Sequence, residues 1–77
     1  MPRQLRKISG TECVKILCNH FGFTIKRQND SHIVLSKESN EVKKSTVVPN
    51  HKELKIGTLK GILELAGIEE EKFAEFQ

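Results

Sequence analysis

The sequence contains no long hydrophobic run. None of its apolar stretches approaches the roughly 18 residues needed for a membrane-spanning helix. Residues 1–7 are basic, but no apolar segment follows them, which argues against a secretion signal. We therefore expect a cytoplasmic protein without a membrane partner. Internal repeats, low-complexity tracts and linkers are also missing, and 77 residues suit one small domain, which we place at residues 1–77.

Cysteine is scarce, because Cys13 and Cys18 are the only two. Five residues apart on a helix, their side chains point about 140° away from each other. They can neither bridge each other within that helix nor hold one ion from one face. A zinc site that added His20 would lack the close paired spacing of such sites. We predict two buried free thiols, which fit a reducing compartment.

The sequence has no glycine-rich phosphate loop and no cluster of carboxylates suited to Mg²⁺. We therefore expect neither a small-molecule cofactor nor a metal ion. Tyrosine and tryptophan are absent as well.

Positive charge is unevenly distributed along the chain. Residues 1–60 contain twelve Lys or Arg against five Asp or Glu, whereas residues 61–77 contain one against five, so a net charge of +7 is followed by −4. The positive charge of residues 1–60 favours a polyanionic partner, most simply a nucleic acid. On charge alone, a solvated basic surface explains the composition equally well.

Two amphipathic helices and a short third one are predicted. Ser9 and Glu12 form a capping-box pattern before a helix over about 10–21, which Gly22 ends. A second helix carries the apolar stripe Leu59, Ile62, Leu63 and Ala66 and ends at Gly67. Glu69–Glu71 opens the last short helix, and we expect Phe73 and Phe76 to bury its inner side.

Three strands lie between the two main helices. Phe23, Ile25 and Arg27 alternate with polar residues, which is the period of a strand over 23–28. Asn29-Asp30 predicts a tight turn, since short Asx side chains bond their own backbone. A second strand follows the turn, and a third covers 42–48 and ends at Pro49. Short connections require antiparallel pairing. The fold class is therefore α+β, a three-stranded antiparallel sheet with helices on one face.

His32 is the best candidate for chemistry. It follows the predicted turn and has the opposite parity from Ile33 and Leu35, together with Val34 and Ser36. We therefore expect it on the side of the sheet that helices leave open. An imidazole both takes and gives a proton near neutrality, which suits general acid–base catalysis. The alternative is an ordinary exposed histidine. Loop structure is the better explanation for His51. For His20 it is the position near the end of the first helix, where a cation suits the helix dipole.

The order helix–strand–strand–strand–helix on a basic chain resembles the double-stranded-RNA-binding fold. More specifically, the chain resembles the HicA family of toxins, small ribonucleases that cleave messenger RNA and are neutralised by a HicB antitoxin. The resemblance runs from Ser9 to Phe73, and its carriers are Gly22-Phe23, Asp30-Ser31-His32, Val47-Val48-Pro49-Asn50-His51 and the pattern Gly57-Thr58-Leu59, Ile62-Leu63, Ala66-Gly67-Ile68.

This resemblance implies a metal-independent endoribonuclease with His32 as its single catalytic histidine, and mRNA and a HicB-like antitoxin as partners. Basic and hydroxyl side chains near the same hairpins would hold phosphates, namely Lys26, Arg27, Ser31, Lys43 and Lys44. Solvated strand faces account equally well for at least half of the basic ones. Strand parity also predicts that only one of Lys43 and Lys44 shares the face of His32.

A binding module is the alternative function. The same fold would then grip RNA or a protein without cutting it. Ser31 beside His32 favours the enzyme. Asp30, which stands where the family usually has glycine, and the missing aromatic residue after the histidine favour the binder.

Overall fold

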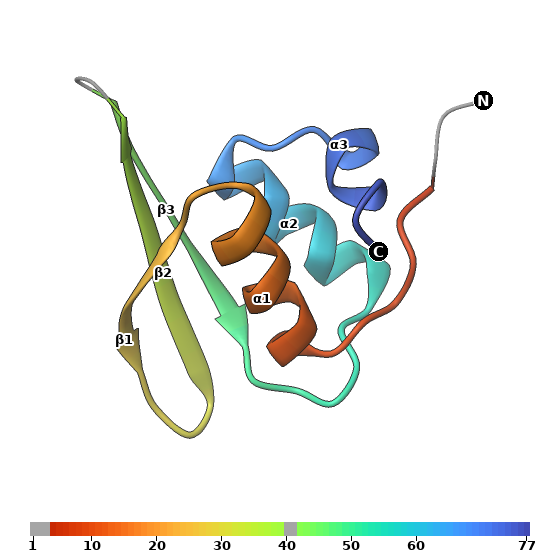
Figure 1. Ribbon diagram of the computed structural model, residues 1–77. Coiled ribbons are helices and arrows are strands. Elements are labelled where there is room, and N and C mark those ends of the chain that lie inside the picture. The colour runs from red at the N-terminus through yellow and green to blue at the C-terminus, as the bar shows by residue number, and fades with distance from the viewer. Residues whose placement is uncertain (1–3, 40–41) are drawn as a thin grey trace.

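The computed structural model describes residues 4–39 and 42–77, and it places three helices on one side of a three-stranded sheet (Figure 1). The elements follow one another along the chain as α1 (Gly10–His20), β1 (Thr24–Gln28), β2 (His32–Ser39), β3 (Val42–Pro49), α2 (Ile56–Ala66) and α3 (Glu70–Ala74). The strands are antiparallel in the order β1-β2-β3. The predicted fold class is thereby confirmed.

The predicted helix ends are confirmed by their caps. The Ser9 hydroxyl accepts a hydrogen bond from the Glu12 backbone N–H at 3.0 Å, as an N-cap residue should. Gly22 follows α1 and Gly67 caps α2, with φ of 76° and 71°. Glycine adopts this left-handed conformation without a steric penalty, which explains why both helices stop there.

The hydrophobic core lies between the sheet and the pair α1 and α2, which both contact β3. Fully or almost fully buried side chains come from every layer: Leu17 from α1, Leu35 and Val48 from the sheet, Leu59 and Leu63 from α2, and Phe73 from α3. Thr46 is a buried polar residue in this layer. Its hydroxyl donates to the Ile62 carbonyl oxygen at 2.9 Å, so the buried hydroxyl has a hydrogen-bond partner.

The β2–β3 register determines which side chains point into the core and which point away from it. Ile33 pairs with Val48, and Leu35 pairs with Thr46; all four are buried under the helices. The alternate positions of β2 therefore face away from the helical layer. In Figure 1 no described helix covers that side of the sheet.

Strand β1 departs from the predicted alternation. Ile25 pairs with Leu35, but Arg27 pairs with Val34, so the register shifts by one residue at Lys26. Such a bulge inserts one residue and moves those after it to the other face. Arg27 thus lies on the open face, and the prediction that it alternates in step with Phe23 and Ile25 was wrong.

Phe76 is the second departure. It was predicted to be buried beside Phe73, yet it remains 41% exposed because α3 ends at Ala74 and Phe76 follows in a turn. Its ring stacks on His20 at the end of α1, with centroids 4.0 Å apart and planes inclined by 13°. This contact gives His20 a structural role through ring stacking, and the predicted favourable position of a cation at the helix end stays a prediction.

Gly10 joins α1 to the segment after β3. Its N–H donates to the His51 carbonyl oxygen at 2.9 Å, and a Cβ at this position would overlap the Pro49 carbonyl oxygen. Gly61, in the middle of α2, has no atom within 4 Å of the same test position.

We predict opposite effects for alanine at these two glycines. Gly10→Ala should destabilise the fold by about 1–3 kcal/mol, since backbone must move to make room. Gly61→Ala should stabilise it by up to about 1 kcal/mol through helix propensity. Urea unfolding of both variants and the parent measures the difference. Equal stability of the two variants would contradict the close contact at Gly10.

The two cysteines are free thiols, with Cys13 buried and Cys18 half-buried. Burial raises the pKa of the Cys13 thiol to about 12 and also raises the pKa of Cys18 above its ordinary value. The thiolate is the reactive form, so both thiols should react slowly.

We predict that iodoacetamide at pH 8 labels Cys18 before Cys13 in the folded protein. A pKa of about 12 leaves only about one Cys13 in ten thousand ionised at that pH. Mass spectrometry of the labelled peptides, with and without urea, distinguishes the sites. In urea both should label at one rate, and equal labelling in the folded state would refute the burial of Cys13.

Candidate catalytic site

The turn between β1 and β2 is built around the side chain of Asn29. Its Oδ1 accepts hydrogen bonds from the backbone N–H of Ser31 at 2.9 Å and of His32 at 2.7 Å. The Asn29 backbone N–H in turn donates to the His32 carbonyl oxygen at 3.0 Å. These bonds confirm the predicted Asx turn and place His32 as the first residue of β2.

A second asparagine supports the turn from the opposite edge of the sheet. The Asn50 backbone N–H donates to the Ser31 carbonyl oxygen at 2.9 Å, and its Nδ2 donates to the Asp30 carbonyl oxygen at 3.5 Å. Asn50 follows β3, whose last residue, Pro49, pairs with His32. The site therefore rests on two segments about 20 residues apart, both at the lower end of the sheet in Figure 1.

His32 is exposed, and one of its ring nitrogens is engaged. The Ser31 hydroxyl lies 2.9 Å from Nδ1 and 3.1 Å from the Oδ1 of Asn29. Among the described residues none hydrogen-bonds Nε2. An imidazole with one oriented nitrogen and one open nitrogen has the arrangement that proton transfer requires.

The face around His32 is basic. The register puts Arg27 opposite Val34, two positions along β2 from His32, and Lys43 opposite Glu38. Lys26 borders a shallow hollow together with Thr24, Ser36 and Glu38, which share this face. At about 3.3 Å per residue, these cations extend for roughly 20 Å from His32 along the sheet.

Lys44 lies on the other side. It lines a pocket under the helices, and its ammonium group lies against Gly67 at the end of α2. Helix carbonyls carry partial negative charge at that end, which suits a lysine there. The structure thus brings Lys26, Arg27, Ser31 and Lys43 to the face of His32 and does not bring Lys44 there, in agreement with the predicted opposite parity of Lys43 and Lys44.

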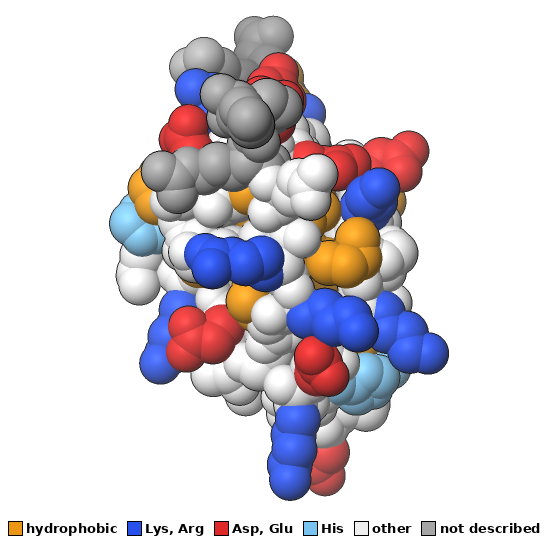
Figure 2. All heavy atoms as spheres, turned by 90° about the vertical axis from the view of Figure 1, so that its right-hand side faces the viewer, with side chains coloured by type: hydrophobic (Ala, Val, Ile, Leu, Met, Phe, Trp, Pro, Cys, Tyr) orange, Lys and Arg blue, Asp and Glu red, His pale blue; other side chains and the backbone are white. Residues whose placement is uncertain are grey.

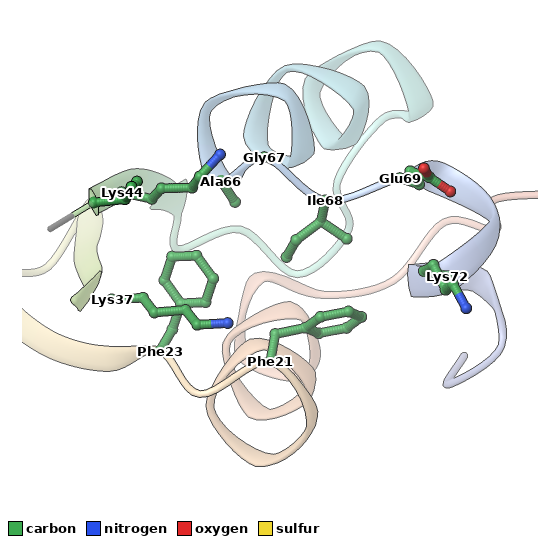
Figure 3. A pocket seen from close by; sticks show the side chains of 10 residues that line it. Phe21, Phe23, Lys37, Lys44, Ala66, Gly67, Ile68, Glu69 and Lys72 are labelled. Atoms are coloured by element: carbon green, nitrogen blue, oxygen red, sulfur yellow. The ribbon is translucent and has the colours of Figure 1, made fainter. Parts of the chain in front are cut away.

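A pocket of about 530 Å³, drawn in Figure 3, does not include His32 among its lining residues. It lies between the ends of α1 and α2, with Phe21, Phe23 and Ile68 among its apolar lining and Lys37, Lys44 and Lys72 around them. Lys37 and Lys44 are five residues along their strands from His32 and Pro49. This pocket is therefore no part of the histidine site.

The helical side of the molecule has a different character. In Figure 2, which looks onto the right-hand side of Figure 1, lysines and arginines are interspersed with acidic residues. Within residues 4–39 and 42–77, no three His, Cys, Asp or Glu side chains gather closely enough to hold a metal ion. The helices of these ranges include none that is long and apolar enough to cross a membrane.

Sequence reasoning missed two features of the site. Asn50 contacts the turn across a separation of 20 residues, and no local period or spacing announces such a contact. Ser36 lies on the open side, as its parity predicts, but its burial was not predicted: it is only 3% exposed, and its Oγ has no hydrogen-bond partner among the described residues. A small side chain on a central strand is covered by its longer neighbours, which parity alone does not reveal.

Comparison with known protein families gives a match. Residues 10–68 match the family described as the HicA toxin of bacterial toxin-antitoxin. Neither a curated protein nor a solved structure matches the chain. The matched region contains the sheet, the two main helices and the turn that carries His32. The chain therefore belongs to the HicA toxin family.

Proposed function

We propose that this protein is an endoribonuclease that cleaves messenger RNA without a metal ion and acts as the toxin of a toxin–antitoxin pair. Membership of the HicA family supports the toxin role and the existence of an antitoxin partner. The observation that carries the catalytic part is His32, exposed on a basic face with Nε2 open and Nδ1 held by Ser31.

The proposed reaction is an internal transfer within the RNA strand. His32 Nε2 takes the proton of a ribose 2′-hydroxyl, whose oxygen attacks the adjacent phosphorus. The bond from phosphorus to O5′ breaks as the bond to O2′ forms, and O5′ takes a proton from the imidazolium or from water. The products are a 2′,3′-cyclic phosphate and a 5′-hydroxyl, with no change in oxidation state.

Arg27 is the cation that we assign to the developing charge. Arg27 lies on the open face and pairs with Val34, two positions along β2 from His32. Lys26 and Lys43 lie further along the strands. A guanidinium binds two phosphate oxygens with a planar pair of donors, so it stabilises charge that gathers in the transition state. The more distant lysines would hold neighbouring phosphates.

The proposed antitoxin is a HicB-like protein. Blocking the toxin requires only that a partner cover His32 and its surroundings, because this face has no described helix over it. The net charge of +7 over residues 1–60 favours a partner with acidic groups at the contact.

We predict that His32→Ala abolishes RNA cleavage and growth arrest while the fold is retained. Losing a general acid–base group costs about 10²–10⁴-fold in rate. Cleavage by the purified parent should persist in EDTA and yield 2′,3′-cyclic phosphate ends. His51→Ala is the matched control, since His51 is exposed in the loop after β3 and should be dispensable.

The same assay decides between the two functions. Cleavage by His32→Ala at the parent rate would refute the catalytic assignment. RNA binding without cleavage by the parent would support the binding module instead.

We predict that Lys43→Ala and Lys44→Ala differ in the salt dependence of RNA binding. Each phosphate contact releases counterions, so removing one flattens the slope of log K against log salt by about one unit. Lys43 lies on the face of His32 and should show this effect, whereas Lys44 faces the helices and should not. Binding of a short RNA to the His32→Ala background, measured across salt concentrations, provides the slopes. A flatter slope for Lys44→Ala than for Lys43→Ala would place the RNA elsewhere.

A further inference from the structure

Three groups converge on the side-chain oxygen of Asn29. The backbone N–H groups of Ser31 and His32 donate to it at 2.9 and 2.7 Å, and the Ser31 hydroxyl lies 3.1 Å from it. Backbone N–H groups only donate, so the atom that they meet must be the oxygen of the amide and not its nitrogen. Asn29 therefore presents a fixed acceptor to the Ser31 hydroxyl.

The Ser31 hydroxyl has a single proton and two neighbours. One is Oδ1 of Asn29, which only accepts; the other is Nδ1 of His32 at 2.9 Å, which donates or accepts according to its tautomer. If the proton points to Asn29, the hydroxyl oxygen accepts from Nδ1–H, and the lone pair of the ring is on Nε2. If the hydroxyl proton points to Nδ1, Nδ1 is the acceptor nitrogen of the ring. The ring hydrogen is then on Nε2, which cannot act as a base.

Protonation of His32 leaves only one of these arrangements. An imidazolium donates from both nitrogens, so the Ser31 hydroxyl must accept from Nδ1–H and direct its own proton elsewhere. Oδ1 of Asn29 lies at the position where that proton must go. The chain of bonds from Nδ1–H to Ser31 to Asn29 therefore matches the state in which the ring has just taken a proton.

We propose that Asn29 is a positioning residue that acts through Ser31 to hold His32 as the tautomer with an open Nε2 lone pair and to stabilise its imidazolium. This inference rests on the proposed catalytic role of His32. A base oriented by a third group is the general arrangement of activated histidines. Here the third group belongs to the same turn, three residues before the histidine.

Asn29 makes one contact more than a turn-forming role requires. The two bonds to backbone N–H groups suffice for an Asx turn. The third contact, to the Ser31 hydroxyl, adds nothing to the backbone, because it connects one side chain to another. Ser31→Ala removes this link and leaves both backbone bonds in place, so the two roles are separable.

We predict that Ser31→Ala and Asn29→Ala each lower kcat for RNA cleavage by about tenfold, which corresponds to about 1.4 kcal/mol. The effect is modest because the site is exposed and water substitutes in part for the lost partner. The double variant should be no slower than the slower single variant, since both changes break one chain of bonds. Asn29→Asp keeps an acceptor oxygen and should restore most of the activity.

The decisive readout is the tautomer of His32, measured by ¹⁵N NMR of labelled imidazole. The parent should carry the hydrogen on Nδ1, and Ser31→Ala and Asn29→Ala should shift the population towards Nε2–H. Asn19→Ala is the matched control, because Asn19 is exposed near the end of α1, and it should change neither the tautomer nor kcat.

The outcomes separate the two proposals. Identical tautomer populations in the parent, Ser31→Ala and Asn29→Ala would overturn the role of Asn29, whatever the activity. A tautomer shift in both variants, together with a parent protein that cleaves no RNA, would support the role of Asn29 and refute the proposed nuclease.

Discussion

The pairing of β2 with β3 is the constraint on which the rest of the structure depends. Ile33, Leu35, Thr46 and Val48 meet in register and form the surface on which α1 and α2 pack. Because side chains alternate along a strand, this register also decides what leaves the core. A slip of one residue would exchange the two faces, bury His32 and expose Leu35. The same apolar contacts that stabilise the domain therefore hold the histidine in solvent.

The turn that carries His32 gains its order from polar bonds, since its residues are exposed and the core begins only at Ile33. Asn29 closes the turn from within, and Asn50 holds it from the end of β3. Gly10 fixes that same segment to α1 through the His51 carbonyl oxygen. Two backbone hydrogen bonds, from Gly10 to His51 and from Asn50 to Ser31, thus join the first helix, the exit of the sheet and the residue before the histidine.

Most of the fold was predictable from the sequence because its signals are local. The cap at Ser9, the glycines after α1 and α2, and the apolar period of α2 are confirmed where they were predicted. The prediction that His32 lies on the opposite face from Ile33 and Leu35 is confirmed for the same reason, since these two buried residues define the inner face of β2. The bulge at Lys26 was not predictable, because the strand residues after Ile25 are all polar and no apolar alternation continues there to reveal a shift. The position of Phe76 and the contact of Asn50 depend on neighbours distant in sequence, which no local pattern encodes.

The bulge changes which side chains share the face of His32. With strict alternation Arg27 would project towards the helices, and the face of His32 would lack the cation that pairs with Val34, two positions along β2. The inserted residue turns Arg27 to the open side while Ile25 keeps its pairing with Leu35. Irregularities of this kind concentrate beside functional sites because they redirect one side chain without disturbing the ladder on either side. The sheet thereby combines an apolar face that folds the chain with a basic face that carries His32, and a single extra residue in β1 reconciles the two.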